Sequence, residues 1–244
     1  YPGSSQDVLS DVNLTLAPGQ VIALVGRNGS GKTTLIKLLC RLYDPRAGKI
    51  TIDGIDLREL DPIHWRREIS VVFQDYVHYQ LKARENIWLG NVAEKPDQEL
   101  IVQAARFSGA DPVIRRLPQG YDTLLSRWFQ NGVELSAGEW QKVALARSFF
   151  RDARVVVLDE PTSSLDALAE AELFHQFREL VKGRSAILIS HRFSTVQMAD
   201  FIYVLDSGRI IEQGTHQDLL RQSGRYAALY QAQAAHYQSG QSAP

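Results

Sequence analysis

The stretch VIALVGRNGSGKTTLIKLLCRLYD, residues 21 to 44, decides the fold of this chain. Its apolar start, Val21 to Gly26, has the composition of a buried strand, and the run from Lys32 to Asp44 has the apolar spacing of a helix. Between them lies GRNGSGKTT, in which a glycine is followed by four residues and then by glycine, lysine and threonine. A glycine-rich loop with this spacing, placed between a strand and a helix, is typical of a nucleotide phosphate site.

The residues of this loop suit a phosphate group. Its glycines allow backbone N–H groups to close around an anion. Lys32 can neutralise the β- and γ-phosphates, and the Thr33 hydroxyl can hold Mg²⁺. An ordinary glycine-rich turn is the alternative, but such a turn does not require Lys32 and Thr33 at these positions. We expect the nucleotide-binding residues of the loop to be Gly26, Arg27, Asn28, Gly29, Ser30, Gly31, Lys32, Thr33 and Thr34.

Composition and charge narrow the class of protein. The 244 residues are 44% hydrophobic and 23% charged, which suits one large domain or two small ones with a real core. A net charge of -1 indicates neither a nucleic-acid surface nor a basic membrane patch. The single cysteine, Cys40, cannot form an internal disulfide and fits a buried thiol in a reducing compartment. No apolar run reaches about 20 residues, and the chain starts at Tyr1, so we expect a piece of a longer protein.

Short apolar runs alternate with helical patterns along the rest of the chain. This alternation predicts an α/β fold with a mainly parallel sheet. The strands expected after the loop lie at residues 48–54, 69–75, 154–160 and 185–190, with a hairpin over 200–214 that turns at a Ser-Gly pair.

Two segments depart from this alternation. Residues from about 76 to 135 show helical patterns and no convincing strand, which predicts an inserted helical subdomain. After about Ala232 the apolar periodicity ends, so residues 233–244 are expected to form a flexible tail behind a domain of residues 1–232.

A pair of carboxylates follows the predicted strand at 154–160. Asp159 and Glu160 are adjacent at the end of VVVLDE, so their side chains leave the strand in different directions. Ligands gather at the carboxyl ends of strands in a parallel sheet. Asp159 can therefore reach Mg²⁺, and Glu160 can face an attacking water as general base. The alternative is that both carboxylates only cap the next helix.

The stretch VELSAGEWQKVALARSFF, residues 133–150, places small and acidic residues directly before a helical run. Ser136 and Glu139 have the spacing of a capping box, in which each side chain takes a backbone N–H of the other residue. Ala137 and Gly138 leave the helix N-terminus almost uncovered, which also suits an anion. Both interpretations stay open from these residues alone.

Taken in order, the motifs resemble those of the ATP-binding cassette (ABC) ATPases, and the resemblance covers nearly the whole chain. Leu135 to Glu139 is similar to the family signature, which normally reads Leu-Ser-Gly-Gly-Gln. Other counterparts are the D-loop at Ser163 to Asp166, the Q-loop glutamine at Gln74, the switch histidine at His191 and the adenine-stacking aromatic at Tyr1. The resemblance implies a P-loop NTPase core with a mainly parallel sheet, an antiparallel β subdomain and an inserted helical subdomain.

The resemblance also implies a mechanism. Two copies pair head to tail around two Mg-ATP, and each ATP lies between the phosphate loop of one copy and Ser136, Ala137 and Gly138 of the other. The ligands implied for Mg²⁺ are Thr33, Gln74 and Asp159. The catalytic residues implied are Glu160, His191, Gln74 and Asp166.

The segments 214–220 and 224–233 resemble the end of exporter cassettes. We therefore expect an ATPase domain that drives export at the cytoplasmic face of the cell membrane. Its expected partners are a second nucleotide-binding domain, in a homodimer, and a transmembrane domain on the same full-length chain, with no nucleic acid. The alternative is a soluble ABC ATPase that acts on DNA or ribosomes. Such proteins usually carry long insertions or paired cassettes, which this sequence lacks.

In the family, the region after the Q-loop forms a groove that receives a short helix of the transmembrane domain. The aromatic residues in this region, Tyr76, Tyr79 and Trp88, fit either a core or an exposed docking surface. Two residues depart from the family signature, because Ala137 replaces a glycine and Glu139 adds a negative charge. We expect the capping box to direct Glu139 away from the phosphate.

Overall fold

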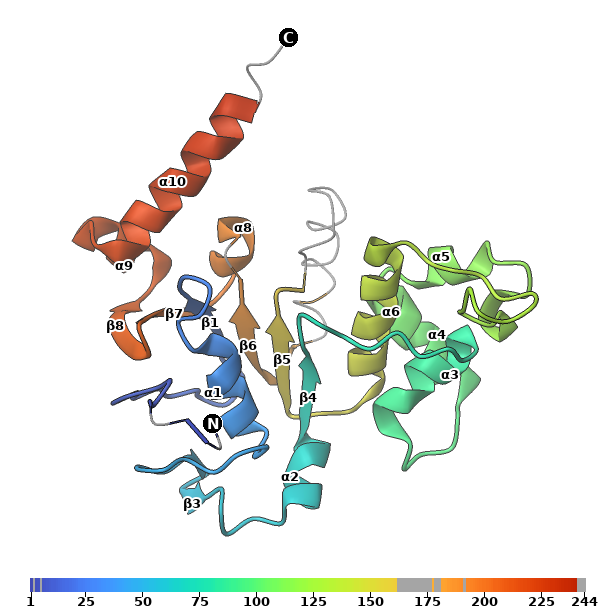
Figure 1. Ribbon diagram of the computed structural model, residues 1–244, viewed down its shortest axis with the longest axis horizontal. Coiled ribbons are helices and arrows are strands. Elements are labelled where there is room, and N and C mark those ends of the chain that lie inside the picture. The colour runs from blue at the N-terminus through green and yellow to red at the C-terminus, as the bar shows by residue number, and fades with distance from the viewer. Residues whose placement is uncertain (2, 5, 162–176, 178–180, 191, 241–244) are drawn as a thin grey trace. The chain divides into compact units, whose positions relative to one another are not determined.

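The computed structural model describes residues 1, 3–4, 6–161, 177, 181–190 and 192–240 of the chain (Figure 1). It divides into two compact units. One unit comprises Tyr1–Ile69 and Ser185–Pro244, and the other comprises Ser70–Arg184. The phosphate loop belongs to the first unit, whereas the Asp-Glu pair and the signature stretch belong to the second.

A buried sheet forms the centre of the first unit. Its strands lie in the order β6-β1-β7-β8, and β1 pairs in parallel with both β6 and β7, whereas β8 pairs antiparallel with β7. Apolar residues of β1 from Ile22 to Val25 are at most 2% exposed, because neighbours cover both faces of this central strand. The bounds are β1 Val21–Val25, β6 Ser185–Ile189, β7 Phe201–Asp206 and β8 Arg209–Gly214, which confirms the strands predicted there.

Helix α1 follows the phosphate loop but spans only Lys32–Leu39, so the prediction that it extends to Asp44 was wrong. Side chains from helix α2, Pro62–Glu68, satisfy its last carbonyls. Trp65 donates its indole N–H to Leu39 O at 2.7 Å, and Arg66 donates to Cys40 O at 3.1 Å. Cys40 is 6% exposed, and burial raises the pKa of its thiol to about 11, which makes it an inert core residue.

A small antiparallel sheet follows α1 in the chain. Strands β2 (Thr51–Ile52) and β3 (Ile55–Asp56) pair across Asp53 and Gly54, which both have positive φ. The strand predicted at 48–54 is therefore the first arm of a two-residue hairpin, whose Asp-Gly turn suits this backbone conformation.

The C-terminal part of the first unit is helical. Glu212 accepts a hydrogen bond from Tyr226 N at 2.9 Å and another from Arg225 N, which anchors the start of helix α10. This helix continues to Gly240, although the apolar periodicity of the sequence ends near Ala232. The flexibility expected of residues 233–244 stays a prediction. Alanine and glutamine dominate the segment and favour a helix even where no apolar stripe continues. The helices are α8 Phe193–Val196, α9 His216–Gln222 and α10 Arg225–Gly240 (Figure 1).

The second unit combines two strands with a set of helices. Residues 76–135, all of which the structure describes, are helical or irregular apart from the isolated bridges Lys82–Leu124 and Leu125–Val133. This arrangement confirms the helical character that the sequence predicts for the segment. The elements are β4 Ile69–Val72, α3 Ala83–Trp88, η1 Leu89–Asn91, α4 Gln98–Phe107, α5 Asp111–Arg115, η2 Gly120–Asp122, α6 Ala137–Phe150 and β5 Val155–Asp159.

Helix α6 is the core of the second unit, because it packs against both α3 and α4. Arg147 on α6 donates to the main-chain oxygen of Asn86 at 2.9 Å and to its side-chain oxygen at 3.0 Å. Asn86 is fully buried and donates in turn to Tyr79 O at 2.9 Å. This network fixes α3 and the segment before it against α6.

The contact between η1 and α6 leaves no room for a side chain at Gly90. A Cβ there would lie 1.9 Å from the carbonyl oxygen of Arg147. We expect Gly90→Ala to lower the free energy of unfolding by roughly 3 kcal/mol, because the added methyl group forces η1 away from α6. Urea unfolding followed by tryptophan fluorescence measures this loss.

Gly183→Ala is the matched control. A Cβ at residue 183 would meet no atom within 4 Å, so only the positive φ of 75° opposes it. We expect this variant to lose about 1 kcal/mol, the cost of a left-handed backbone with a side chain. Equal losses in the two variants would show that η1 does not pack tightly against α6.

Candidate nucleotide site

The phosphate loop of the first unit has room for an anion because its glycines leave out side chains. A Cβ at Gly26 would lie 2.1 Å from the carbonyl oxygen of Leu205, so the loop can leave β1 only through a glycine. Gly31 has a φ of 108° and precedes the first residue of α1. The first turn of α1 therefore begins directly at the loop, with its backbone N–H groups at the loop end.

Two polar side chains are buried within the loop. Ser30 is 4% exposed, and its Oγ is one of two buried side-chain polar atoms without a hydrogen-bond partner among the described residues. Lys32 is 8% exposed and donates from Nζ to Gly26 O at 2.8 Å and to Arg27 O at 3.0 Å. An unpaired buried hydroxyl costs about 1–3 kcal/mol. A phosphate oxygen beside Ser30 would remove this cost, and it would also suit the Lys32 ammonium.

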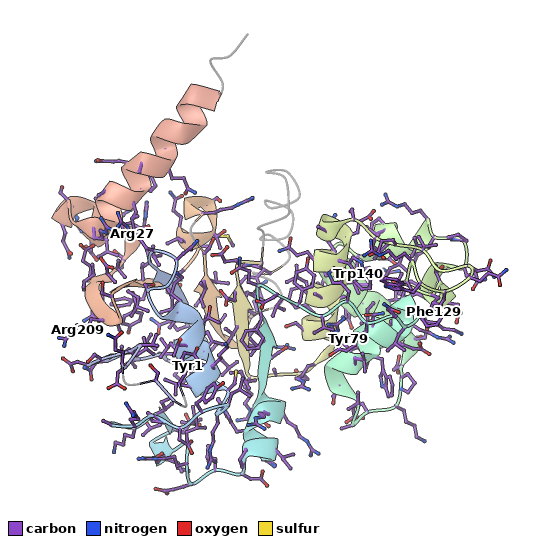
Figure 2. All side chains as sticks on the ribbon, viewed as in Figure 1. Tyr1, Arg27, Tyr79, Phe129, Trp140 and Arg209 are labelled. Atoms are coloured by element: carbon purple, nitrogen blue, oxygen red, sulfur yellow. The ribbon has the colours of Figure 1, made fainter. Side chains whose placement is uncertain are left out.

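Tyr1 lies beside the loop helix. Its hydroxyl is 2.9 Å from Thr34 Oγ1, and its ring meets Tyr43 edge-on with 5.3 Å between the centroids. The side chain remains 47% exposed. Figure 2 shows Tyr1 and Arg27 in the first unit. The structure thus brings Tyr1 to the same helix as Thr33 and Thr34, and Lys37 Nζ of this helix lies over the ring at 5.6 Å from its centroid.

In the second unit, the acidic pair lies at the end of β5. Asp159 is the last residue of the strand and is 3% exposed. Glu160 follows with a φ of 54°, which is uncommon for a residue with a side chain and turns the chain sharply after the strand. Its carbonyl oxygen accepts from Gln141 Nε2 at 3.3 Å. Local strain of this kind is frequent at functional sites.

The signature stretch forms the capping box that the sequence predicts. Ser136 is the N-cap of α6, and its Oγ accepts from Glu139 N at 3.4 Å, while Glu139 Oε2 accepts from Ser136 N at 2.8 Å. Ser136 and Ala137 are exposed. The helix start therefore has its own cap and still presents the Ser136 hydroxyl and small residues to solvent, so both interpretations of the stretch fit the structure.

Gln74 lies after the end of β4 and is exposed. The residues just beyond it contact the start of α6. Tyr76 donates its hydroxyl to Ala137 O at 3.0 Å, and His78 stacks on Trp140 with 4.4 Å between ring centroids. Sequence reasoning missed this link, because the aromatic spacing after Gln74 does not indicate which helix the rings meet.

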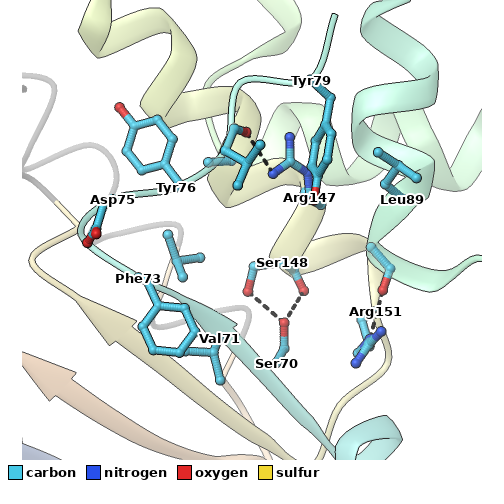
Figure 3. Close-up of a pocket in the computed structure, with 14 residues that line it drawn as sticks. Ser70, Val71, Phe73, Asp75, Tyr76, Tyr79, Leu89, Arg147, Ser148 and Arg151 are labelled. Carbon is cyan, nitrogen blue, oxygen red and sulfur yellow. Dashed lines mark hydrogen bonds between the residues drawn. The ribbon is translucent and has the colours of Figure 1, made fainter. Parts of the chain in front are cut away.

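A pocket of about 270 Å³ lies next to this segment (Figure 3). Ser70 at its base donates to Ser148 O at 3.0 Å, and Arg147 lies over the ring of Tyr79 with 4.6 Å from Cζ to the centroid. Burial lowers the pKa of the Arg147 guanidinium, which nevertheless stays charged. The rim includes exposed apolar surface at Val77 and Tyr79. The pocket therefore combines a fixed positive charge with an apolar edge.

The remaining predicted residues lie in different places. His191 and Asp166 fall outside the described residues. Of the predicted Mg²⁺ ligands, Thr33 belongs to the first unit, and Gln74 and Asp159 belong to the second. All three offer oxygen atoms, which Mg²⁺ prefers, and Mg²⁺ bound to a nucleotide needs only one or two carboxylates. The described residues contain no group of three or more His, Cys, Asp or Glu that could hold a metal ion.

Comparison with known proteins agrees with these features. Residues 9–163, well over half of the chain, match the family model for the ABC transporter. An ATP-dependent lipid A-core flippase of Alkalilimnicola ehrlichii is 43% identical over 96% of this chain, and the subtilin transport ATP-binding protein SpaT of Bacillus subtilis is 40% identical over 94%. A bacterial Atm1-family ABC exporter, solved with ATP bound, is 37% identical over 94% of this chain, with a TM-score of 0.87.

The chain spans 39% of the length of the flippase, 37% of SpaT and 39% of the exporter chain. Within the part of the chain that the structure describes, none of the helices has the length and apolar character needed to cross a bilayer. The phosphate loop, the strand-end carboxylates and the capped signature helix all occur in the segment that these relatives share with the chain. The chain belongs to the ABC transporter family, as an ATP-binding domain of the exporter type.

Proposed function

We propose that this chain hydrolyses ATP as one half of a head-to-tail dimer and that it powers export by a membrane transporter. The observation that carries the proposal is the phosphate loop, where Ser30 Oγ is buried without a partner and Lys32 is held at the loop carbonyls. These two groups suit the phosphates of a nucleotide. The family and the exporter relatives support an ATPase that is linked to transport.

The chemistry assigned to the chain is transfer of the γ-phosphoryl group to water. Glu160 would accept a proton from the attacking water, while Lys32 and the loop N–H groups would stabilise charge on the phosphates. Thr33, Gln74 and Asp159 would hold Mg²⁺, which neutralises part of the phosphate charge. His191 and Asp166 are proposed to act at the γ-phosphate and across the dimer, on the basis of their motif positions alone.

The dimer completes the site in this proposal. The signature helix α6 of one copy would face the γ-phosphate bound to the other copy. Its exposed Ser136 hydroxyl and the uncovered N–H groups of its first turn are the donors, and the helix dipole favours the negative charge. Each of the two composite sites thus needs residues from both chains.

The pocket beside Tyr79 is the proposed docking site for a transmembrane domain. Its apolar rim at Val77 and Tyr79 would receive an apolar side chain of a short helix, and Arg147 would contact the carbonyl groups at that helix C-terminus. We also propose that this domain lies at the cytoplasmic face of a membrane. The relatives are more than twice as long as this chain and are transporters by name, which supports a link to a membrane protein.

A soluble ATPase that acts on DNA or ribosomes has less support. The net charge of -1 does not indicate a nucleic-acid surface, and the compared relatives are transporters by name. The relative named for lipid A-core is 43% identical to this chain, and the relative named for subtilin is 40% identical. Cassettes of similar sequence thus serve transporters of different cargoes.

The role of Glu160 is tested by Glu160→Gln. We expect ATP binding to persist while hydrolysis slows on the order of 10²- to 10⁴-fold, because a positioned general base is lost. Steady-state phosphate release measures the rate, and a fluorescent ATP analogue reports binding. A rate within about threefold of the unmodified chain is too small a loss for a general base and would remove Glu160 from that role.

The role of Ser136 is tested by Ser136→Ala. Loss of the cap should cost about 1 kcal/mol of stability, whereas loss of a donor to the γ-phosphate should slow turnover about 10²-fold per folded molecule. Thr215→Ala is the control, because Thr215 also caps a helix and accepts from Asp218 N at 3.3 Å. We expect both variants to lose stability and only Ser136→Ala to lose activity. Full activity of Ser136→Ala would mean that its hydroxyl is only a cap.

A further inference from the structure

The signature helix carries a negative charge close to the end that is proposed to bind phosphate. Glu139 is the third residue of α6, at a position where the family signature normally has glutamine. A free carboxylate at this position would repel a phosphate that approaches the same helix turn, since like charges within a few ångström disfavour each other. The helix therefore needs a feature that offsets this charge.

Both carboxylate oxygens of Glu139 have partners in the structure. Oε2 accepts from Ser136 N at 2.8 Å within the capping box, and Oε1 forms an ion pair with Nη2 of Arg116. The side chain of Glu139 is 20% exposed, whereas that of Arg116 is 65% exposed. The pair thus turns the carboxylate back toward its own helix start and covers it with a cation.

Arg116 reaches Glu139 from a fixed position. It is the C-cap of α5, and its N–H bonds to Ile114 O. The start of α5 is anchored at Asp111, which accepts from Arg115 Nε at 2.8 Å and from Tyr121 Oη at 2.7 Å. The neighbouring arginines therefore have different partners, since Arg115 pairs with Asp111 and Arg116 pairs with Glu139.

We propose that Arg116 is a positioning residue that neutralises Glu139 and holds it in the capping box, so that the start of α6 can receive the γ-phosphate of a nucleotide bound to a second copy. The inference rests on the proposed function. Neutralisation by Arg116 explains how this chain combines an acidic signature residue with an anion site. Arg116 should then be needed only while residue 139 carries a negative charge.

The test uses four forms of the 244-residue chain, which are the unmodified chain, Arg116→Ala, Glu139→Gln and the double variant. Steady-state turnover per folded molecule is one readout. The second is the ATP concentration at half-maximal dimer formation, measured by light scattering with Glu160→Gln added to each form. Melting temperatures report any loss of stability separately.

Arg116→Ala should lower turnover about fivefold and raise the ATP concentration at half-maximal dimer formation about fivefold. A change of this size is expected when one partly screened charge is lost at a helix terminus. Glu139→Gln alone should be neutral or mildly activating, because the amide keeps the capping geometry without the charge. The double variant should match Glu139→Gln, because no charge is left for Arg116 to offset.

Arg115→Ala is the matched control. It removes the same charge from the adjacent residue, which is 59% exposed and does not contact Glu139. In this variant the Tyr121 hydroxyl still donates to Asp111 at 2.7 Å and holds the start of α5, so turnover and dimer formation per folded molecule should stay unchanged.

Three results would overturn the proposal. Arg116→Ala that behaves like Arg115→Ala would show that the cation has no effect on phosphate binding. A double variant as impaired as Arg116→Ala would show that Arg116 acts through another residue. If the unmodified chain neither hydrolyses ATP nor forms dimers in the presence of ATP, the proposed function and this inference both fail. Measurement of the unmodified chain separates this result from the other two.

Discussion

The proposed nucleotide site depends on one constraint, which is that two helix N-termini must stay free of covering side chains. At α1 the chain meets this constraint with a glycine, because the N-cap Gly31 has a φ of 108° and no side chain that could cap the helix. At α6 it uses a capping box, in which Ser136 and Glu139 satisfy each other and the first turn carries only small residues. Positive helix ends without covering side chains are natural sites for phosphate.

Helix α6 connects three functional features within the second unit. Its start carries the signature turn and accepts a hydrogen bond from Tyr76, two residues after Gln74. Its middle contacts the carbonyl of Glu160 through Gln141, and its last part lines the pocket with Arg147. We propose that a rigid helix with these contacts transmits a change at the signature turn to a partner in the pocket.

Local patterns predicted the parts of the fold whose causes are local. The strand, loop and helix around Lys32 follow from glycine spacing and apolar periodicity, and the capping box of Ser136 and Glu139 follows from their three-residue spacing. The early end of α1 was not predictable in the same way. It depends on Trp65, which reaches Leu39 O from 26 residues further along the chain.

The candidate site shows the same division. The sequence could indicate the loop and the Asp159–Glu160 pair as candidates, because each motif is a continuous stretch. It did not predict that Arg116 pairs with Glu139, because this contact joins α5 to α6 across the fold. The resemblance to the family indicated glutamine as the usual residue at 139, but only the tertiary contact showed how a glutamate is accommodated.

We propose that each ATP site combines the phosphate loop of one chain with the signature helix of another. The most direct measurement is ATP turnover in a mixture of Lys32→Ala and Ser136→Ala chains. Each variant alone should be nearly inactive, whereas a mixed dimer keeps one site with an intact Lys32 and an intact Ser136 from opposite chains. An equal mixture should recover up to about a quarter of the unmodified rate if dimers form at random. A rate no higher than the mean of the two separate variants would contradict the account.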